Sequence, residues 1–257
     1  QKAGSVLVFP YYTSTIGGTS DTRMTITNVS NEATANRAYV HLFFIDGASC
    51  QPLDMFLCLT PNASFAFKAS EFDPGNTGYL IAVVVDNQGV PTRNNVLIGN
   101  AFVNTPQFAD NYGAESFYAN TFALTTVNGN TATLYFDQIG YDAAPKQFTV
   151  EIQSPLDTAG QEVVTVGLNG DLTTSTIRGA GQIGTGLAFN EKEDFTSFAS
   201  WLRENCQSRA SISTSSPRVP GGLGSLIKSG QVGSLKFNVG GAVGLLMTPR
   251  TAPWRGI

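Results

Sequence analysis

Side chains that commonly carry out catalysis are few in this chain of 257 residues. A Ser–His–carboxylate triad needs a histidine, but the one histidine, His41, lies in a strand-like apolar run, and no Gly-x-Ser-x-Gly motif is present. Glycoside hydrolysis needs two carboxylates and no histidine, and the densest acidic cluster is Glu191, Glu193 and Asp194. These acids fit the first turn of a helix that begins at Asn190. We therefore predict that the protein is not an enzyme, and keep a glycoside-active enzyme as the weakest alternative.

Sites for cofactors and metals are equally sparse. Residues 179–184 match the Gly-x-Gly-x-x-Gly pattern of dinucleotide-binding loops, but no strand–helix–strand unit surrounds them. Zinc sites need four ligands at short spacings, which three dispersed cysteines and one histidine do not supply. Segments 86–89 and 169–171 offer oxygen ligands for Ca²⁺, but neither completes the EF-hand pattern. We expect turns in both segments and no cofactor, with a bound Ca²⁺ as the alternative.

The cysteines suggest a disulfide. Cys50 and Cys58 are separated by seven residues that include Pro52, and such a segment closes a hairpin disulfide if the chain turns at the proline. We therefore predict a Cys50–Cys58 disulfide. Cys206 is then left over, either as a free buried thiol or as a partner in an intermolecular bond.

The elements that must position these residues are predicted to be strands. Runs of β-branched and aromatic residues alternate with Gly, Pro, Asn and Asp, and Asn128-Gly129 and Asn169-Gly170 favour hairpin turns because both residues accept positive φ. The pattern predicts an all-β fold, a sandwich of many short antiparallel strands, as one body or as two packed lobes. The predicted strands comprise residues 5–12, 23–28, 37–45, 55–59, 64–69, 79–85, 96–103, 131–136, 147–153, 162–168, 174–177, 186–189, 211–214, 234–239 and 242–247.

One short helix is expected near residues 190–204. Asn190 is a suitable N-cap residue with acids in the following turn. Phe195, Phe198, Ala199 and Leu202 then recur at the spacing of one helical face. Residues 111–121 carry a weaker pattern of the same kind and are a second candidate helix.

The N-terminus is unusually apolar. Residues 5–12 are apolar on both faces, and an exposed strand of this kind would promote aggregation. It is either a central strand of its own sheet or a strand that completes the sheet of a neighbouring subunit, with residues 14–20 as a flexible joint. We divide the chain into residues 1–14, this strand, and 15–257, a sandwich body. The residues expected at a subunit interface are Val6, Leu7, Val8, Phe9, Tyr11, Tyr12 and, in the C-terminal tail, Trp254.

Charge is scarce and unevenly distributed. The chain has 15 basic and 19 acidic residues. Residues 1–204 hold nine bases and all 19 acids, whereas residues 205–257 hold six bases and no acid. The bases are too dispersed to follow a phosphate backbone, so we expect no nucleic-acid partner. Opposite charges either meet within one molecule or between copies arranged head to tail. The chain contains no run of 18 apolar residues, so no membrane-spanning helix is predicted.

Three segments resemble secreted β-rich bacterial proteins of unassigned function. They are residues 2–14 (KAGSVLVFPYYTS), 40–47 (VHLFFIDG) and 73–79 (DPGNTGY), and the resemblance covers roughly the first 120 residues. It implies export and a β fold, and no mechanism. A start at Gln1 and a composition rich in Thr and Asn with six Lys agree with an exported protein at a bacterial surface.

Together these features predict a secreted structural protein. We expect it to assemble head to tail with copies of itself into an extracellular filament or surface layer, by addition of the N-terminal strand. The alternative is a carbohydrate- or cell-surface-binding β-sandwich module that uses exposed aromatic side chains. The candidates for that role are Tyr11, Tyr12, Trp201 and Trp254.

Overall fold

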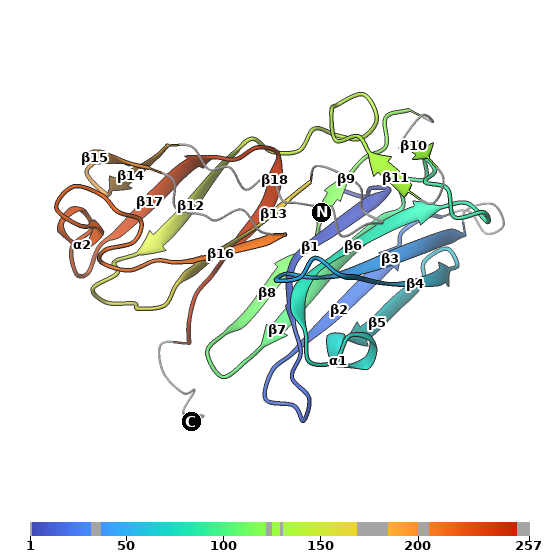
Figure 1. Ribbon diagram of the computed structural model, residues 1–257, viewed down its shortest axis with the longest axis horizontal. Coiled ribbons are helices and arrows are strands. Elements are labelled where there is room, and N and C mark those ends of the chain that lie inside the picture. The colour runs from blue at the N-terminus through green and yellow to red at the C-terminus, as the bar shows by residue number, and fades with distance from the viewer. Residues whose placement is uncertain are drawn as a thin grey trace.

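The computed structural model describes residues 2–31, 37–121, 125–128, 131–168, 185–199 and 206–250 (Figure 1). Regular structure in these residues is nearly all β, which confirms the predicted fold class. The two helices, α1 (Ala69–Phe72) and α2 (Leu223–Leu226), are single turns. No helix in the described part of the chain is long and apolar enough to cross a membrane.

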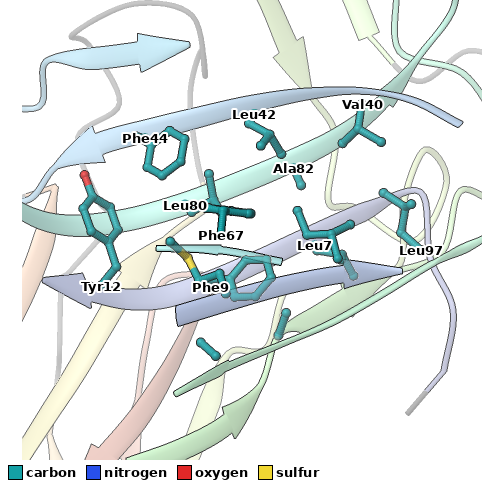
Figure 2. Close-up of a cluster of buried hydrophobic side chains, with 14 of the residues drawn as sticks. Leu7, Phe9, Tyr12, Val40, Leu42, Phe44, Phe67, Leu80, Ala82 and Leu97 are labelled. Carbon is teal, nitrogen blue, oxygen red and sulfur yellow. The ribbon is translucent and has the colours of Figure 1, made fainter. Parts of the chain in front are cut away.

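The first sandwich is built from the N-terminal half of the chain. Its core is formed by alternate residues of two facing sheets, among them Leu7, Phe9, Leu42 and Phe44 from one sheet and Phe67 from the other (Figure 2). One sheet has the order β4 (Pro52–Leu59), β3 (Ala38–Asp46), β6 (Thr77–Val85), β1 (Val6–Thr13) and β9 (Glu115–Phe117). The other has the order β5 (Ser64–Lys68), β2 (Asp21–Asn28), β7 (Leu97–Asn104) and β8 (Ala109–Gly113).

The second sandwich lies beside the first and holds the C-terminal half (Figure 1). One sheet has the order β12 (Gln147–Gln153), β17 (Val232–Asn238), β14 (Gly186–Asn190) and β15 (Phe195–Phe198), and the other β16 (Gln207–Ser211), β13 (Glu162–Gly167) and β18 (Ala242–Met247). Between the sandwiches in sequence, β10 (Thr125–Asn128) and β11 (Thr131–Leu134) form a hairpin at the predicted place, but Asn128 pairs with Thr131, one residue later than a turn centred on Asn128-Gly129 gives.

Strand β1 is buried on both faces within its own chain. It pairs with β6 and β9 and contributes Leu7 and Phe9 to the core of the first sandwich. Its opposite face, with Val6 and Val8, packs in a second cluster that includes Val166 of β13. The second sandwich therefore covers the outer face of this sheet, and this cover explains why residues 5–12 carry no polar face.

Polar contacts join the sandwiches where β1 is irregular. The register with β6 shifts between Phe9 and Tyr12, so the carbonyl groups at this point need another donor. The buried Gln207 side chain of β16 provides it, since its Nε2 donates to the carbonyl oxygens of Pro10 and Gly78, at 2.7 Å each.

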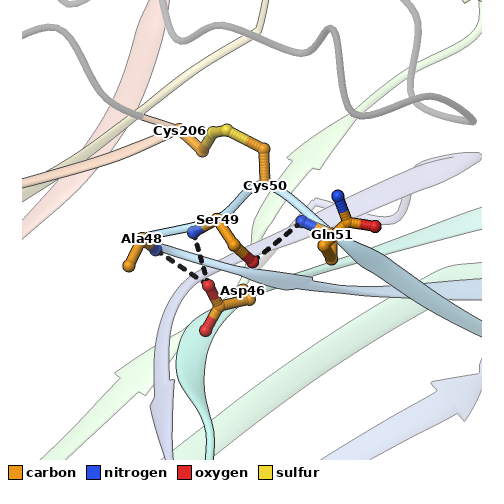
Figure 3. Close-up of a disulfide and its surroundings, with 6 residues drawn as sticks. All are labelled: Asp46, Ala48, Ser49, Cys50, Gln51 and Cys206. Atoms are coloured by element: carbon orange, nitrogen blue, oxygen red, sulfur yellow. Dashed lines mark hydrogen bonds between the residues drawn. A yellow bond between two sulfur atoms is a disulfide. The ribbon is translucent and has the colours of Figure 1, made fainter.

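The predicted disulfide is wrong. Cys50 bonds to Cys206, 156 residues away, with Cα atoms 5.6 Å apart (Figure 3), while Cys58 is free and exposed. The reason is that the chain does not turn back at Pro52, which is the first residue of β4. Cys58 is six residues further along this extended strand, roughly 20 Å from Pro52 at about 3.3 Å per residue. The bond instead connects the β3–β4 turn to the second sandwich.

Both predicted helices are also wrong over the described residues. The first, near 190–204, begins as the hairpin β14–β15, and its residues 200–204 lie outside the described part of the chain. The Asn190 side chain accepts N–H bonds from Lys192 and Asp194, which closes a hairpin turn and not a helical one. Residues 111–121 contain the end of β8 and all of β9. The last predicted strand before β17, residues 211–214, is found earlier as β16.

Candidate functional site

The second sandwich covers only part of its neighbouring sheet, and aromatic side chains occupy the uncovered part. In the β3–β4 pair, Tyr39 is opposite Cys58 and His41 is opposite Phe56. Directly opposed residues of antiparallel strands share a face, so Tyr39, His41 and Phe56 form one surface, which we call the aromatic shelf. Phe56 is 57 % exposed and Tyr39 40 % exposed.

The rings of the shelf are fixed by stacking. The His41 ring lies 3.9 Å from that of Phe56 with an interplanar angle of 23°, and 3.9 Å from that of Phe43 on its other side. Its Nε2 is 2.8 Å from a carboxylate oxygen of Asp54. Burial lowers the pKa of His41, and the hydrogen bond to Asp54 only partly offsets this effect. The imidazole is therefore neutral at pH 7 and extends the shelf as a flat, uncharged ring.

A hollow of about 460 Å³ opens beside the shelf. Its second wall is the loop that follows β6, which is held by the carboxylate of Asp86 as it accepts the backbone N–H groups of Gln88 and Val90, each at 2.9 Å. Volumes of this order are typical of small-molecule sites. The hollow is lined by Tyr39, Phe56, Leu57, Cys58, Asp86, Asn87, Gln88 and Gly89.

The chemistry of the hollow is apolar on one wall and hydrogen-bonding on the other. An aromatic face attracts the weakly positive C–H groups of a flat ligand, while the amides of Asn87 and Gln88 both donate and accept hydrogen bonds. Among the described residues that line the hollow, Asp86 is charged and none is basic. The arrangement fits a neutral, hydroxyl-rich ring and disfavours an anionic ligand.

Neither predicted Ca²⁺ loop gains support. In the loop at 86–89, one oxygen of the Asp86 carboxylate is already used by the turn itself. Residues 169–171 lie outside the described part of the chain. Within the described residues, no group of three or more His, Cys, Asp or Glu side chains is arranged to hold a metal ion.

None of the described residues that were predicted as binding aromatics or for a subunit interface lies on this surface. Tyr11 and Tyr12 are buried, so the prediction that they are exposed binding aromatics is wrong. Trp201 and Trp254 lie outside the described residues. The predicted interface set Val6, Leu7, Val8, Phe9, Tyr11 and Tyr12 is buried in β1, inside its own chain, and its exchange between subunits stays a prediction.

Two polar contacts account for the buried tyrosines. The hydroxyl group of Tyr12 donates to the carboxylate of Asp73. The Arg209 guanidinium lies 5.2 Å from the centre of the Tyr11 ring, and it also forms an ion pair with Glu162. Tyr11 and Tyr12 therefore support the sandwich interior and the join between the sandwiches.

Sequence reasoning missed Tyr39, Phe56 and the loop at 86–89 as one site. The strands that carry Tyr39 and Phe56 were expected, but their apolar residues fall on both faces. The local sequence does not indicate which face of these two strands will be covered by a segment far away in the chain. Comparisons of the chain with protein-family models, with curated proteins and with solved structures find no match, so the site is interpreted from its own geometry.

Proposed function

We propose that the protein is an extracellular, non-enzymatic β-sandwich protein that binds neutral carbohydrate on the aromatic shelf. The observation that carries the proposal is the exposed Phe56 ring, stacked on His41 and facing the amide-bearing loop at 86–89 across a hollow. The Cys50–Cys206 disulfide supports an oxidising location.

Neutral sugars match both walls of the hollow. A pyranose ring presents a face of C–H groups to an aromatic ring and hydroxyl groups at its rim. Asn87 and Gln88 are exposed and line the hollow, so their amides can exchange hydrogen bonds with those hydroxyl groups. An acidic sugar in the hollow would meet the carboxylate of Asp86 and be repelled.

The test is a glycan array followed by calorimetry with the best neutral oligosaccharide. We expect Phe56→Ala and Tyr39→Ala each to weaken binding roughly tenfold or more, because each removes one stacking face. The matched control is Phe102→Ala, which removes a ring that is 44 % exposed on β7, away from the hollow. Equal losses in all three variants, or no neutral ligand for the wild type, contradict the proposal. Cleavage of the bound oligosaccharide contradicts its non-enzymatic part.

Self-assembly into a filament or surface layer is the second candidate function. It is favoured by the setting of β1, which has only the three-residue strand β9 on its outer side. A loop follows β1 in which Gly17 and Gly18 have positive φ and Ile16 is 84 % exposed. Such a loop is a suitable hinge for a strand that leaves its own sheet and fills the same place in a neighbour.

Negative-stain microscopy of concentrated protein tests this candidate, with a staple as its control. Val6 of β1 is opposite Val83 of β6, so Val6→Cys with Val83→Cys, oxidised in dilute solution, holds β1 in its own chain. Assembly by exchange predicts filaments from the wild type and monomers from the stapled variant. Dispersed wild-type monomers, or filaments from both proteins, would exclude strand exchange.

A further inference from the structure

The outer edge of β4 is open. Among the described strands only β3 pairs with β4, along eight residues, so the opposite side of β4 has no strand partner in the described part of the chain. Sheet edges are usually protected by lysines, internal prolines or bulges. In β4 the proline is at the first position and the one charge is Asp54, while Leu53 and Phe56 are exposed.

Other described edges are better protected or shorter. β9 and β15 have three and four residues, and β5 ends in Lys68. β12 presents alternating polar side chains with Glu151 among them. Strand β4, with eight residues, is the longest edge strand of the described sheets.

We propose that β4 pairs antiparallel with β4 of a second copy of this chain, about a twofold axis at Phe56. In antiparallel pairing, directly opposed residues lie on the same face of the sheet. Residues 54, 56 and 58 share the face of the aromatic shelf, and residues 55, 57 and 59 share the core face. A twofold axis perpendicular to the sheet must therefore set one residue of β4 opposite its own copy. An axis between two residues would bring residues of different faces opposite each other.

The strand sequence selects among such axes. An axis at Phe56 places Phe56 opposite its own copy, Met55 opposite Leu57 and Leu53 opposite Leu59, which are aromatic and aliphatic pairs that favour sheets. Asp54 then faces Cys58 of the second copy and not another carboxylate. The neighbouring axis at Met55 instead brings Phe56 opposite Asp54 and includes Pro52 opposite Cys58, where the proline has no N–H to donate.

The closed twofold pairing ends in a dimer and not in a filament. It joins two five-stranded sheets into one and sets the two aromatic shelves side by side on the same face. The pairing is tested by the oligomeric state and the proposed function by ligand binding, so failure of one can be distinguished from failure of the other.

A disulfide trap tests both the interface and its register. Asp54→Cys places a thiol opposite the partner's Cys58, where Cα atoms of opposed residues are about 4.5–5.5 Å apart and within disulfide range. We expect a covalent dimer on mild oxidation and its loss when Cys58→Ser is added. The wild type should give no such dimer, because its two Cys58 residues are four positions apart, about 14 Å.

Two further variants, Leu53→Cys and Leu53→Lys, serve as controls. Leu53→Cys puts the thiol opposite Leu59 on the other face and should not be trapped with Cys58. Sedimentation of the unmodified wild type should show a dimer fraction that rises with concentration, and Leu53→Lys should abolish it by placing a charge on the open edge. A wild-type protein that remains monomeric at high concentration overturns the interface. A covalent dimer from the wild type, or equal trapping by Leu53→Cys, overturns the register.

Discussion

Loss of the Cys50–Cys206 disulfide should strongly lower the free energy of unfolding of this protein. The bond closes a segment with a sequence separation of 156 residues. The chain-entropy relation for a loop of that length gives about 5 kcal/mol of stabilisation at 25 °C, and measured values for disulfides are typically about 2–4 kcal/mol. We therefore expect Cys50→Ser with Cys206→Ser to lower the free energy of unfolding by about 2–5 kcal/mol.

Equilibrium unfolding in urea, followed by circular dichroism under non-reducing conditions, measures this loss. The matched control is Cys58→Ser, which removes an exposed free thiol and should change the free energy of unfolding by less than about 0.5 kcal/mol. A disulfide between Cys50 and Cys58 would instead make the Cys58→Ser variant as unstable as Cys50→Ser.

Peptide mapping tests the Cys50–Cys206 pairing independently. Trypsin leaves Cys50 and Cys58 together in residues 38–68 and Cys206 in residues 204–209. A Cys50–Cys206 bond joins these two peptides, and reduction separates them. Finding residues 38–68 unlinked and closed on themselves would refute the assigned pairing and the magnitude worked from it.

Two other predictions concern the join between the sandwiches and its surroundings. Gln207→Met keeps the side-chain volume but leaves the buried carbonyl groups of Pro10 and Gly78 without their donor, and should cost about 2–4 kcal/mol in urea unfolding, whereas Gln51→Met on the exposed turn should be neutral. Burial raises the pKa of Asp110 above its usual 3.8, so the folded protein binds a proton at Asp110 more tightly than the unfolded chain does. At pH values above 3.8 the Asp110 carboxyl group therefore lowers the free energy of unfolding. Asp110→Asn should therefore raise the midpoint of thermal unfolding at pH 7, with a difference that disappears below pH 3.8; a variant that is less stable at pH 7 would contradict this reasoning.

The join also explains how the shelf keeps its shape. Gln207 fixes the irregular part of β1, and the adjacent Cys206 holds the β3–β4 turn. These contacts set where the second sandwich ends on the sheet that carries Tyr39 and Phe56. The exposed part of that sheet is thus determined by residues more than 100 positions away in the sequence.

Local chemistry was sufficient to predict many of the strands. Residues 147–153 and 242–247 form β12 and β18 with the predicted bounds, because β-branched runs between turn residues favour extended backbone independently of what packs on them. A hairpin also forms where Asn128-Gly129 predicts one, although its register differs by one residue.

Local chemistry misled where one signal fits two structures. An asparagine followed by acids caps a helix, but at Asn190 the same side chain accepts N–H bonds from a hairpin turn. Phe195 and Phe198, three residues apart, match one face of a helix. In β15 they point to opposite sides, and Phe195 is 65 % exposed while Phe198 is buried.

By itself the sequence determined the all-β class, most strands and the need to bury an N-terminal strand that is apolar on both faces, since these depend on neighbouring residues. Only the tertiary structure decided what covers that strand, which cysteine bonds to Cys50 and which aromatic side chains remain exposed. Each of these depends on contacts between segments far apart in the chain. Such contacts leave no periodic pattern in either segment, and they form because the second sandwich covers one part of the sheet and leaves Tyr39 and Phe56 open.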